Sequence, residues 1–296
     1  MFTTRNYDTV KKLKCLVIKG QRPSHLAKNQ VENLSLLIFN SVMEYFVHKD
    51  SIVRQIWGKS DTILFIFAGA SAEFALNKAV DWLYFTGRLP ADPLGRLFST
   101  VSYARGIVFA ERGAAEKTID KITAIHKGVE NARGSVIPDW AYRDVLFMLI
   151  HYSIAAYELL ERKLSPAEKQ EAYDVFYRMG TRMGIDALPP YYVDWLPIRE
   201  QHLKEDLVLS DYTLDLYKQY KKHLGAFRYA ILKEAQLLVV PPLVKRLLRL
   251  GNVSLLRPVV PLYKVSRILK MDWMIKAVLL PSAYKKEIAE LDVVGR

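Results

Sequence analysis

The sequence predicts an all-α protein, formed by a single helical domain that encloses a buried pocket. Three observations support this fold class. Apolar residues recur every three or four positions in most segments, which is the period of one helix face. Alternation with a period of two, which is typical of half-buried strands, is scarce. Residues that favour helix starts precede several of the apolar segments.

The first predicted elements lie in the N-terminal part of the chain. We expect residues 1–55 to form an N-terminal helical extension and residues 56–296 to form the domain. No secretory signal is predicted, because the longest apolar run near the N-terminus, Cys15–Ile18, has four residues, whereas a signal needs about 7–15. The apolar segment 61–76 is interrupted by Glu73 before it reaches the roughly 20 residues of a membrane span. We therefore expect a buried core helix there.

Helix starts are also marked along the rest of the chain, by an N-cap residue, by proline or by both, at Asp92–Pro93, Pro138–Asp139, Ser165–Pro166 and Ser210–Asp211. At the third of these, Glu168 completes a capping box, and Gly184 is expected to end the helix. Proline-marked corners with bulky aromatic residues separate the segments. These corners favour one packed domain over two tethered ones.

The C-terminal quarter of the chain is predicted to be a basic, amphipathic helical region. The net charge is +12, and from Gly225 onward there are 13 Lys or Arg residues and 5 Asp or Glu residues. Leu, Val and Ile lie between these charges, and no nucleic-acid motif accompanies them. This composition favours peripheral contact with a membrane, or an apolar substrate, over nucleic acid. The alternative is an ordinary amphipathic helix whose Lys and Arg side chains reach the solvent.

Several kinds of catalytic site are excluded by the sequence. Cys15 is the one cysteine, so internal disulfides are impossible and a reducing, cytoplasmic location is expected. The chain has no Gly-rich phosphate loop, no Gly-x-Ser-x-Gly elbow and no Glu-x-x-His pair of the kind that holds di-iron centres.

His126 and His151 remain as candidates for chemistry. His151 lies in the middle of an apolar helix with no charged neighbour on the same face, and His126 lies on a helix that is apolar on one side. One interpretation is a core histidine that is hydrogen-bonded to the main chain or to a neighbouring helix. The other is a neutral imidazole that binds a metal. No second protein ligand lies in reach on that helix, so the metal would need its own coordination, as haem has.

A second group of candidates lies on the helix that starts at Asp92–Pro93. Arg96, Ser99 and Thr100 are spaced at i, i+3 and i+4 and therefore share one face. An arginine can hold a carboxylate such as a haem propionate with two hydrogen bonds. Alternatively, the arginine is solvated and the two hydroxyl groups bind main-chain carbonyls.

These motifs, in this order, resemble a known family. RLFST (96–100), IHKGV (125–129), IHYS (150–153) and ERKLSPAEKQEAYDVFYRMGTRMGI (161–185) are similar to the MpaB-type and rubber-oxygenase (latex clearing protein) catalytic domains. The resemblance covers roughly residues 60–215. It implies an all-helical fold with haem b and an enzyme that uses dioxygen to cleave double bonds of isoprenoid chains.

The resemblance also implies roles for individual residues. His151 matches the proximal haem ligand, and Arg96 and Thr100 match the Arg and Thr of the Arg-x-x-Lys-Thr motif, as catalytic and cofactor-binding residues. His126 matches the histidine of the Ile-His-x-x-Val pattern. Ser99 takes the place of the lysine that can be a second axial ligand, so the sixth coordination position is left to water or dioxygen.

From these observations we predict a haem-dependent oxygenase that acts on an apolar small molecule. His151 is expected to bind the iron, and Arg96, Ser99, Thr100 and His126 to line the haem pocket. The alternative is a non-catalytic helical protein that binds haem or another apolar ligand and associates peripherally with membranes.

Overall fold

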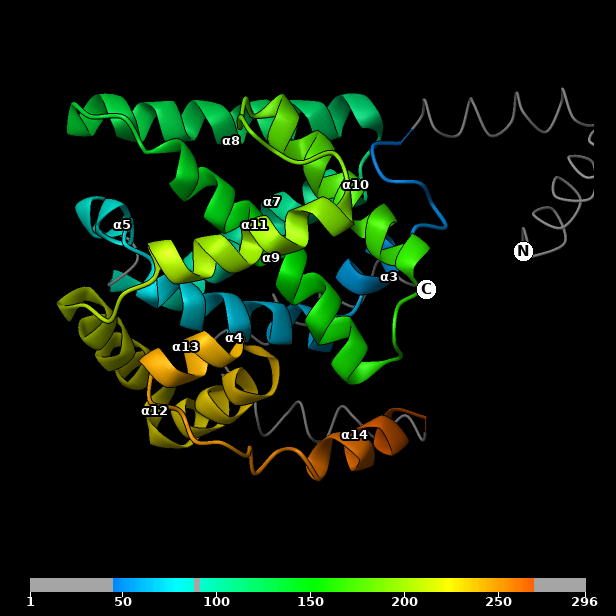
Figure 1. Ribbon diagram of the computed structural model, residues 1–296, viewed down its shortest axis with the longest axis vertical. Helices are drawn as coiled ribbons and strands as arrows, with labels where there is room; N and C mark the ends of the chain where they lie inside the picture. The colour runs from blue at the N-terminus through cyan, green and yellow to red at the C-terminus, as the bar shows by residue number, and fades with distance from the viewer. Residues whose placement is uncertain (1–44, 88–90, 269–296) are drawn as a thin grey trace, which may run out of the picture.

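The computed structural model describes residues 45–87 and 91–268 (Figure 1). Within these ranges the protein is helical and has no strand, and its two β-bridges are isolated pairs, Tyr45 with Glu111 and Asn77 with Leu207. The all-α prediction is therefore confirmed. The helices are α3 (Ile52–Trp57), α4 (Ser60–Leu76), α5 (Asp81–Phe85), α7 (Pro93–Val108), α8 (Arg112–Arg133), α9 (Asp139–Leu160), α10 (Pro166–Arg182), α11 (Tyr192–Asp206), α12 (Asp211–Val239), α13 (Pro242–Leu247) and α14 (Val259–Ile268).

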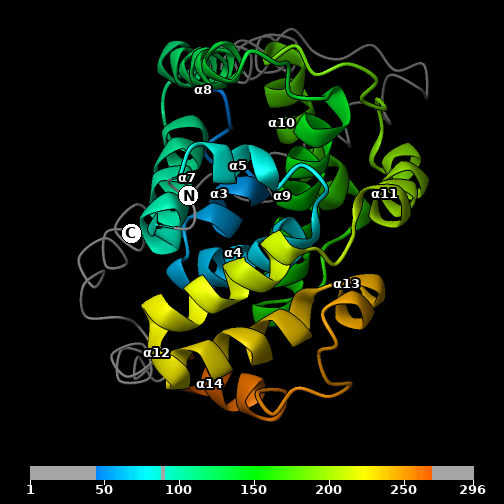
Figure 2. The ribbon, with the colours of Figure 1, turned by 90° about the vertical axis from the view of Figure 1, so that its left-hand side faces the viewer.

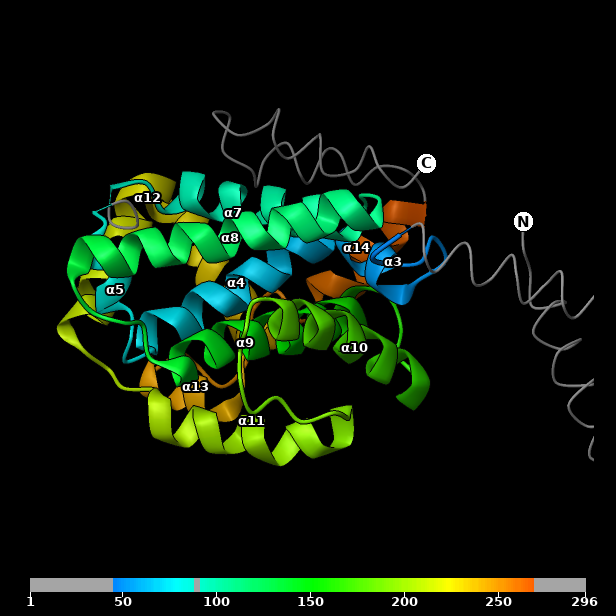
Figure 3. The same ribbon diagram turned by 90° about the horizontal axis from the view of Figure 1, so that it is seen from above.

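Helix α4 is the central helix of the fold, as the segment 61–76 predicts. Seen from above, it lies in the middle, with α8 on one side and α11 on the other (Figure 3). Twelve of its 17 residues are buried. Gly69 allows the ring of Tyr152 on α9 to pack directly against the α4 backbone, because a Cβ atom at this position would overlap that ring. The closest helix pair of the core is thus α4 with α9.

The predicted helix starts agree with the structure. Asp92 caps α7 by accepting a hydrogen bond from the Gly95 amide, and Pro93 is the first helical residue. Ser165 and Glu168 form the capping box of α10. Helix α10 ends at Arg182, two residues before Gly184, which has a φ of +78°. Local capping chemistry therefore sets these boundaries, as the sequence indicates.

Helix α12 is not straight, which the sequence did not indicate. Gly225 has non-helical backbone angles, φ 75° and ψ 165°, and the chain reverses there. The Tyr217 hydroxyl donates a hydrogen bond of 2.9 Å to Gln236, 19 residues later, which in a straight helix would be about 28 Å away. Figure 2 shows the two arms of α12 running side by side.

The two ends of the chain extend beyond the described residues. Phe46, Val47, Ile52 and Val53, at the end of the predicted N-terminal extension, pack in the main hydrophobic core. Residues 1–44 lie outside the described part, so the extension stays a prediction. The predicted basic C-terminal region is described up to Ile268 and contains α13 and α14. Among the described helices, none combines the length and the apolar character needed to cross a bilayer.

Candidate functional site

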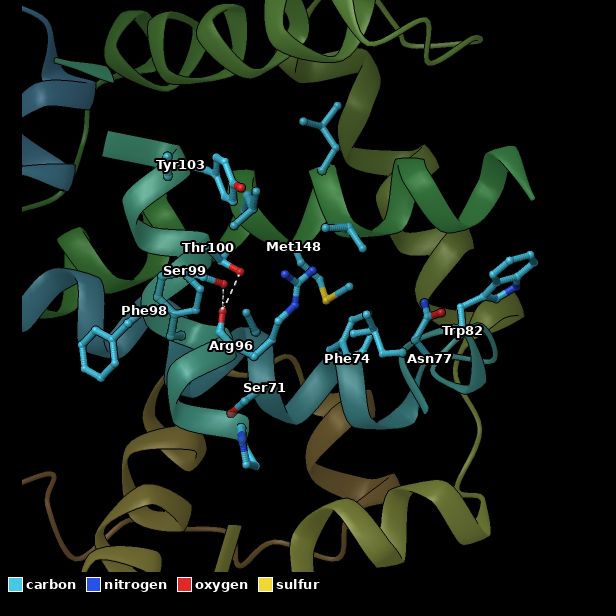
Figure 4. Close-up of a pocket in the computed structure, with 18 of the residues that line it drawn as sticks. Ser71, Phe74, Asn77, Trp82, Arg96, Phe98, Ser99, Thr100, Tyr103 and Met148 are labelled. Carbon is cyan, nitrogen blue, oxygen red and sulfur yellow. Dashed lines mark hydrogen bonds between the residues drawn. The ribbon is translucent and has the colours of Figure 1, made fainter. Parts of the chain in front are cut away.

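A large cavity lies between α4, α7, α8, α9 and α12. Its volume is about 1070 Å³, close to the upper limit of the roughly 300–1,000 Å³ that small-molecule and cofactor sites occupy. Most of its wall is apolar and includes aromatic side chains, among them Phe74, Trp82, Phe98 and Tyr103 (Figure 4). This wall suits a ligand with a large apolar surface.

The charged residues in the wall are two arginines. Arg96 comes from α7 and Arg228 from α12, while no Asp, Glu or Lys belongs to the wall formed by the described residues. His126 of α8 and His223 of α12 also line the cavity. Positive charge is effective in attracting anions where the surroundings are apolar. The cavity therefore favours a ligand that carries carboxylates or other anionic groups on an apolar body.

Arg96, Ser99 and Thr100 all line the cavity, as their spacing on α7 predicts. The Arg96 side chain reaches into the cavity toward Met148 (Figure 4). The hydroxyl groups of Ser99 and Thr100 both donate to the main-chain carbonyl of Arg96, at 2.9 and 3.0 Å. The two hydroxyl groups therefore bind a main-chain carbonyl, as the second interpretation states, while all three residues reach the cavity. The role of Arg96 in holding a propionate stays a prediction.

His126 faces the same cavity from α8. Its Nδ1 atom is buried and has no hydrogen-bond partner among the described residues. Burial, and then the positive charge of Arg96, lower the pKa of His126, so its ring is neutral near pH 7. The ring of Tyr142 packs edge-on against it, with 5.3 Å between centroids. The Tyr142 hydroxyl is held by Glu130 at 3.1 Å. A fixed, neutral imidazole with an unpaired nitrogen can bind a metal.

His151 is not among the residues that line this cavity, and its predicted role as the haem ligand stays a prediction. The α9 side of the wall is formed by residues such as Tyr142, Val145 and Leu149. His151 lies nine residues after Tyr142 but only one helical turn after Met148, which lines the cavity, so it lies beside the face of α9 that forms the wall.

The surroundings of His151 are those of a core histidine. Its ring packs edge-on against Tyr152, with 4.9 Å between centroids, and forms a hydrogen bond with the main chain of Val239. Burial, and then the charge of Arg199, lower the pKa of His151 to about 4. This geometry fits both interpretations, because a histidine that binds a metal also donates its second ring N–H to a main-chain carbonyl or a similar acceptor.

Glu73, the carboxylate within the apolar segment, belongs to a buried ion pair. It is 1% exposed and accepts hydrogen bonds from Arg199 at 2.5 Å and from the Tyr152 hydroxyl at 2.8 Å. Like His151, it does not line the cavity. Arg199 lies on α11, 126 positions further along the chain, so this pairing could not be inferred from the spacing of residues in the sequence. The pair joins α4, α9 and α11.

A second polar cluster contains Asp144, His202 and Asp206, whose nearest ligand atoms lie within 4.8 Å of one another. The His202 Nδ1 atom lies 2.6 Å from Asp144 and 3.2 Å from Asp206, and Asn77 donates to the other oxygen of Asp144 at 2.6 Å. These hydrogen bonds explain why the three side chains lie close together. It joins the C-terminal ends of α4 and α11 to α9.

Sequence reasoning missed three residues of the cavity wall. Arg228 and His223 flank the chain reversal at Gly225, and without that reversal nothing places them near α7. Tyr142 supports His126 through ring packing. Its position three residues into α9 could have been noticed, but its partner on α8 could not.

Comparison with known proteins gives one match. Residues 56–274, which make up most of the chain, match the family described as ER-bound oxygenase mpaB/B'/Rubber oxygenase, catalytic domain. No curated protein and no solved structure matches this chain. The matched range includes the whole cavity wall described above. The chain therefore belongs to the mpaB and rubber-oxygenase catalytic-domain family.

Proposed function

We propose that the protein is a haem-dependent oxygenase, with haem b held by His151 or His126 and an apolar substrate bound in the cavity. One observation carries this proposal. The wall of one large apolar cavity brings together the His126 ring and the Arg96–Ser99–Thr100 face, and Met148, one turn before His151, also belongs to this wall. Oxygenase chemistry is the activity of the family to which the chain belongs.

The residues of the cavity fit the requirements of haem. The macrocycle needs an extended apolar site, and the protein needs to provide as little as one axial histidine. His126 offers this ligand in its neutral form. The two propionates need positive partners, and the wall contains the guanidinium groups of Arg96 and Arg228. His151, which the resemblance implies as the proximal ligand, is the other candidate, because its hydrogen bond with the main chain of Val239 leaves the second ring nitrogen free.

Bound haem would supply the activation of dioxygen, the co-substrate. The chain's own residues bind and orient the haem and the substrate. Tyr142 holds the His126 ring in place by edge-on packing. The hydroxyl groups of Ser99 and Thr100 donate to the Arg96 carbonyl, and either has to rotate before it can donate to a ligand in the cavity. The apolar wall positions an alkene or a similar apolar group and keeps water out.

The absorption spectrum of the purified protein, expressed with added haem precursor, tests this proposal. A Soret band that shifts on reduction with dithionite is expected for the wild type. The variant that loses most of the bound haem, His151→Ala or His126→Ala, identifies the ligand. A colourless wild-type protein would contradict the proposal, and full haem content in both variants would contradict both ligand candidates. Oxygen uptake with isoprenoid substrates then separates catalysis from haem binding alone.

A further inference from the structure

The surface formed by residues 253–265, which includes most of α14, carries an unusual number of exposed apolar side chains. We refer to it as the α14 surface. Its exposed apolar side chains are Val253 (66% exposed), Leu255 (78%), Val259 (40%), Leu262 (69%) and Val265 (52%). Figures 1 and 2 both show α14 at the lower edge of the molecule. Clustered exposure of this kind marks an interaction site and is not expected of an ordinary surface.

The opposite side of α14 is fixed to the protein. Tyr263 donates to Asp61 of α4 at 3.3 Å, and Arg267 pairs with Asp61 at 3.3 Å and with Glu161 at 2.6 Å. These contacts set the rotation of the helix. Leu262 and Val265 are therefore directed away from the protein by a helix that is itself held in place.

The chain that forms this surface is basic, and the carboxylates that contact it are engaged: Glu234 accepts a hydrogen bond from the Leu255 amide at 2.6 Å, and Asp61 and Glu161 pair with Arg267. Between Gln236 and Ile268 the chain contains six Lys or Arg residues and no Asp or Glu. Arg257 lies within the α14 surface, and Arg246 and Arg249 lie just before it. These three side chains are exposed and form no ion pair with the described residues. An anionic partner would complement them.

The type of apolar residue distinguishes a lipid bilayer from a protein partner. Centres of protein interfaces are rich in Trp, Tyr and Arg, whereas Leu and Val are under-represented among the residues that dominate binding. The exposed residues here are Leu and Val, with basic residues around them, which is the composition of helices that lie in the plane of a membrane. We propose that the α14 surface binds the surface of an anionic phospholipid bilayer. This proposal is independent of the proposed function.

Flotation of the full-length protein with vesicles tests the proposal. The probes are phosphatidylcholine vesicles with and without phosphatidylserine, at low and at physiological salt. The wild type should bind the anionic vesicles, and salt should weaken the binding. Arg257→Gln should lower the partition coefficient about five-fold. The double variant Leu255→Glu/Leu262→Glu should lower it by at least about ten-fold.

The matched control is Val136→Glu/Val193→Glu, which adds the same two charges at residues that are 72% and 66% exposed elsewhere on the protein. It should lower binding much less than the α14 double variant. Three results would overturn the proposal: no binding of the wild type to anionic vesicles at low salt, equal binding to neutral vesicles, or equal loss in the control. A change from dimer to monomer in the α14 variant, without loss of vesicle binding, would assign the surface to a second copy of the chain instead.

Discussion

His126 and His151 are both neutral near pH 7, because each has a lowered pKa and in both the largest cause is burial. The Nδ1 atom of His126 has no hydrogen-bond partner among the described residues. His151 forms a hydrogen bond with the main chain of Val239. Such a bond from one ring nitrogen leaves the lone pair of the other nitrogen free, so both side chains could bind a metal.

His151 should make the stability of the protein depend on pH. Its pKa is about 4 in the folded protein, against about 6.5 in an unfolded chain. As the pH falls below 6.5, the unfolded state takes up a proton before the folded state does, so the free energy of unfolding decreases until the pH reaches about 4. Between pH 7 and pH 5 the titration of His151 should lower the free energy of unfolding by up to about 2 kcal/mol.

The variant His151→Gln keeps a hydrogen-bond donor but cannot titrate. Urea unfolding at pH 7 and pH 5 should therefore show a smaller loss of stability in the variant than in the wild type. His126 titrates in both proteins and so cancels from the comparison. An equal loss in the two proteins would show that His151 is not held neutral.

Among the elements, the close packing of α4 against α9 depends on the absence of a side chain at Gly69. The substitution Gly69→Ala would place a methyl group in the ring of Tyr152, and overpacking of this kind costs about 1–3 kcal/mol. Gly128→Ala in α8 is the control, because a Cβ atom there has no neighbour within 4 Å and alanine favours the helix by about 0.5–1 kcal/mol. The melting temperature should thus fall in Gly69→Ala and rise in Gly128→Ala. A higher melting temperature in Gly69→Ala would contradict this packing.

The elements also show how much of the structure was predictable. Helix boundaries at Asp92–Pro93 and Ser165 followed from local hydrogen bonding, which the sequence contains. The orientation of His151 could not be predicted from the sequence, because α9 is buried on nearly all sides and its apolar pattern does not select one face. Arg96, Ser99 and Thr100 could be placed together because they lie within one turn of one helix. Their partners on α8 and α12 depend on tertiary packing, which spacing along the chain does not encode.

For the whole molecule, the cavity makes stability depend on its ligand. A ligand that binds only the folded state stabilises it by about 2.7 kcal/mol at a concentration of 100 Kd. Addition of haemin to haem-free protein should raise the melting temperature of the wild type in proportion to the logarithm of the haemin concentration. The variant that lacks the iron ligand, His151→Ala or His126→Ala, should show a much smaller rise, measured by calorimetry. An undiminished rise in both variants would mean that haemin binds elsewhere.

The reversal of α12 at Gly225 affects the size of the cavity. His223, Leu224 and Arg228 sit on either side of the bend and close one end of the wall. The helices that carry His126 and Arg96 take no part in the bend. Inserting residues at this bend would enlarge the cavity and leave His126 and its neighbours unchanged. The bend is therefore the place where the protein can be altered to admit a bulkier ligand.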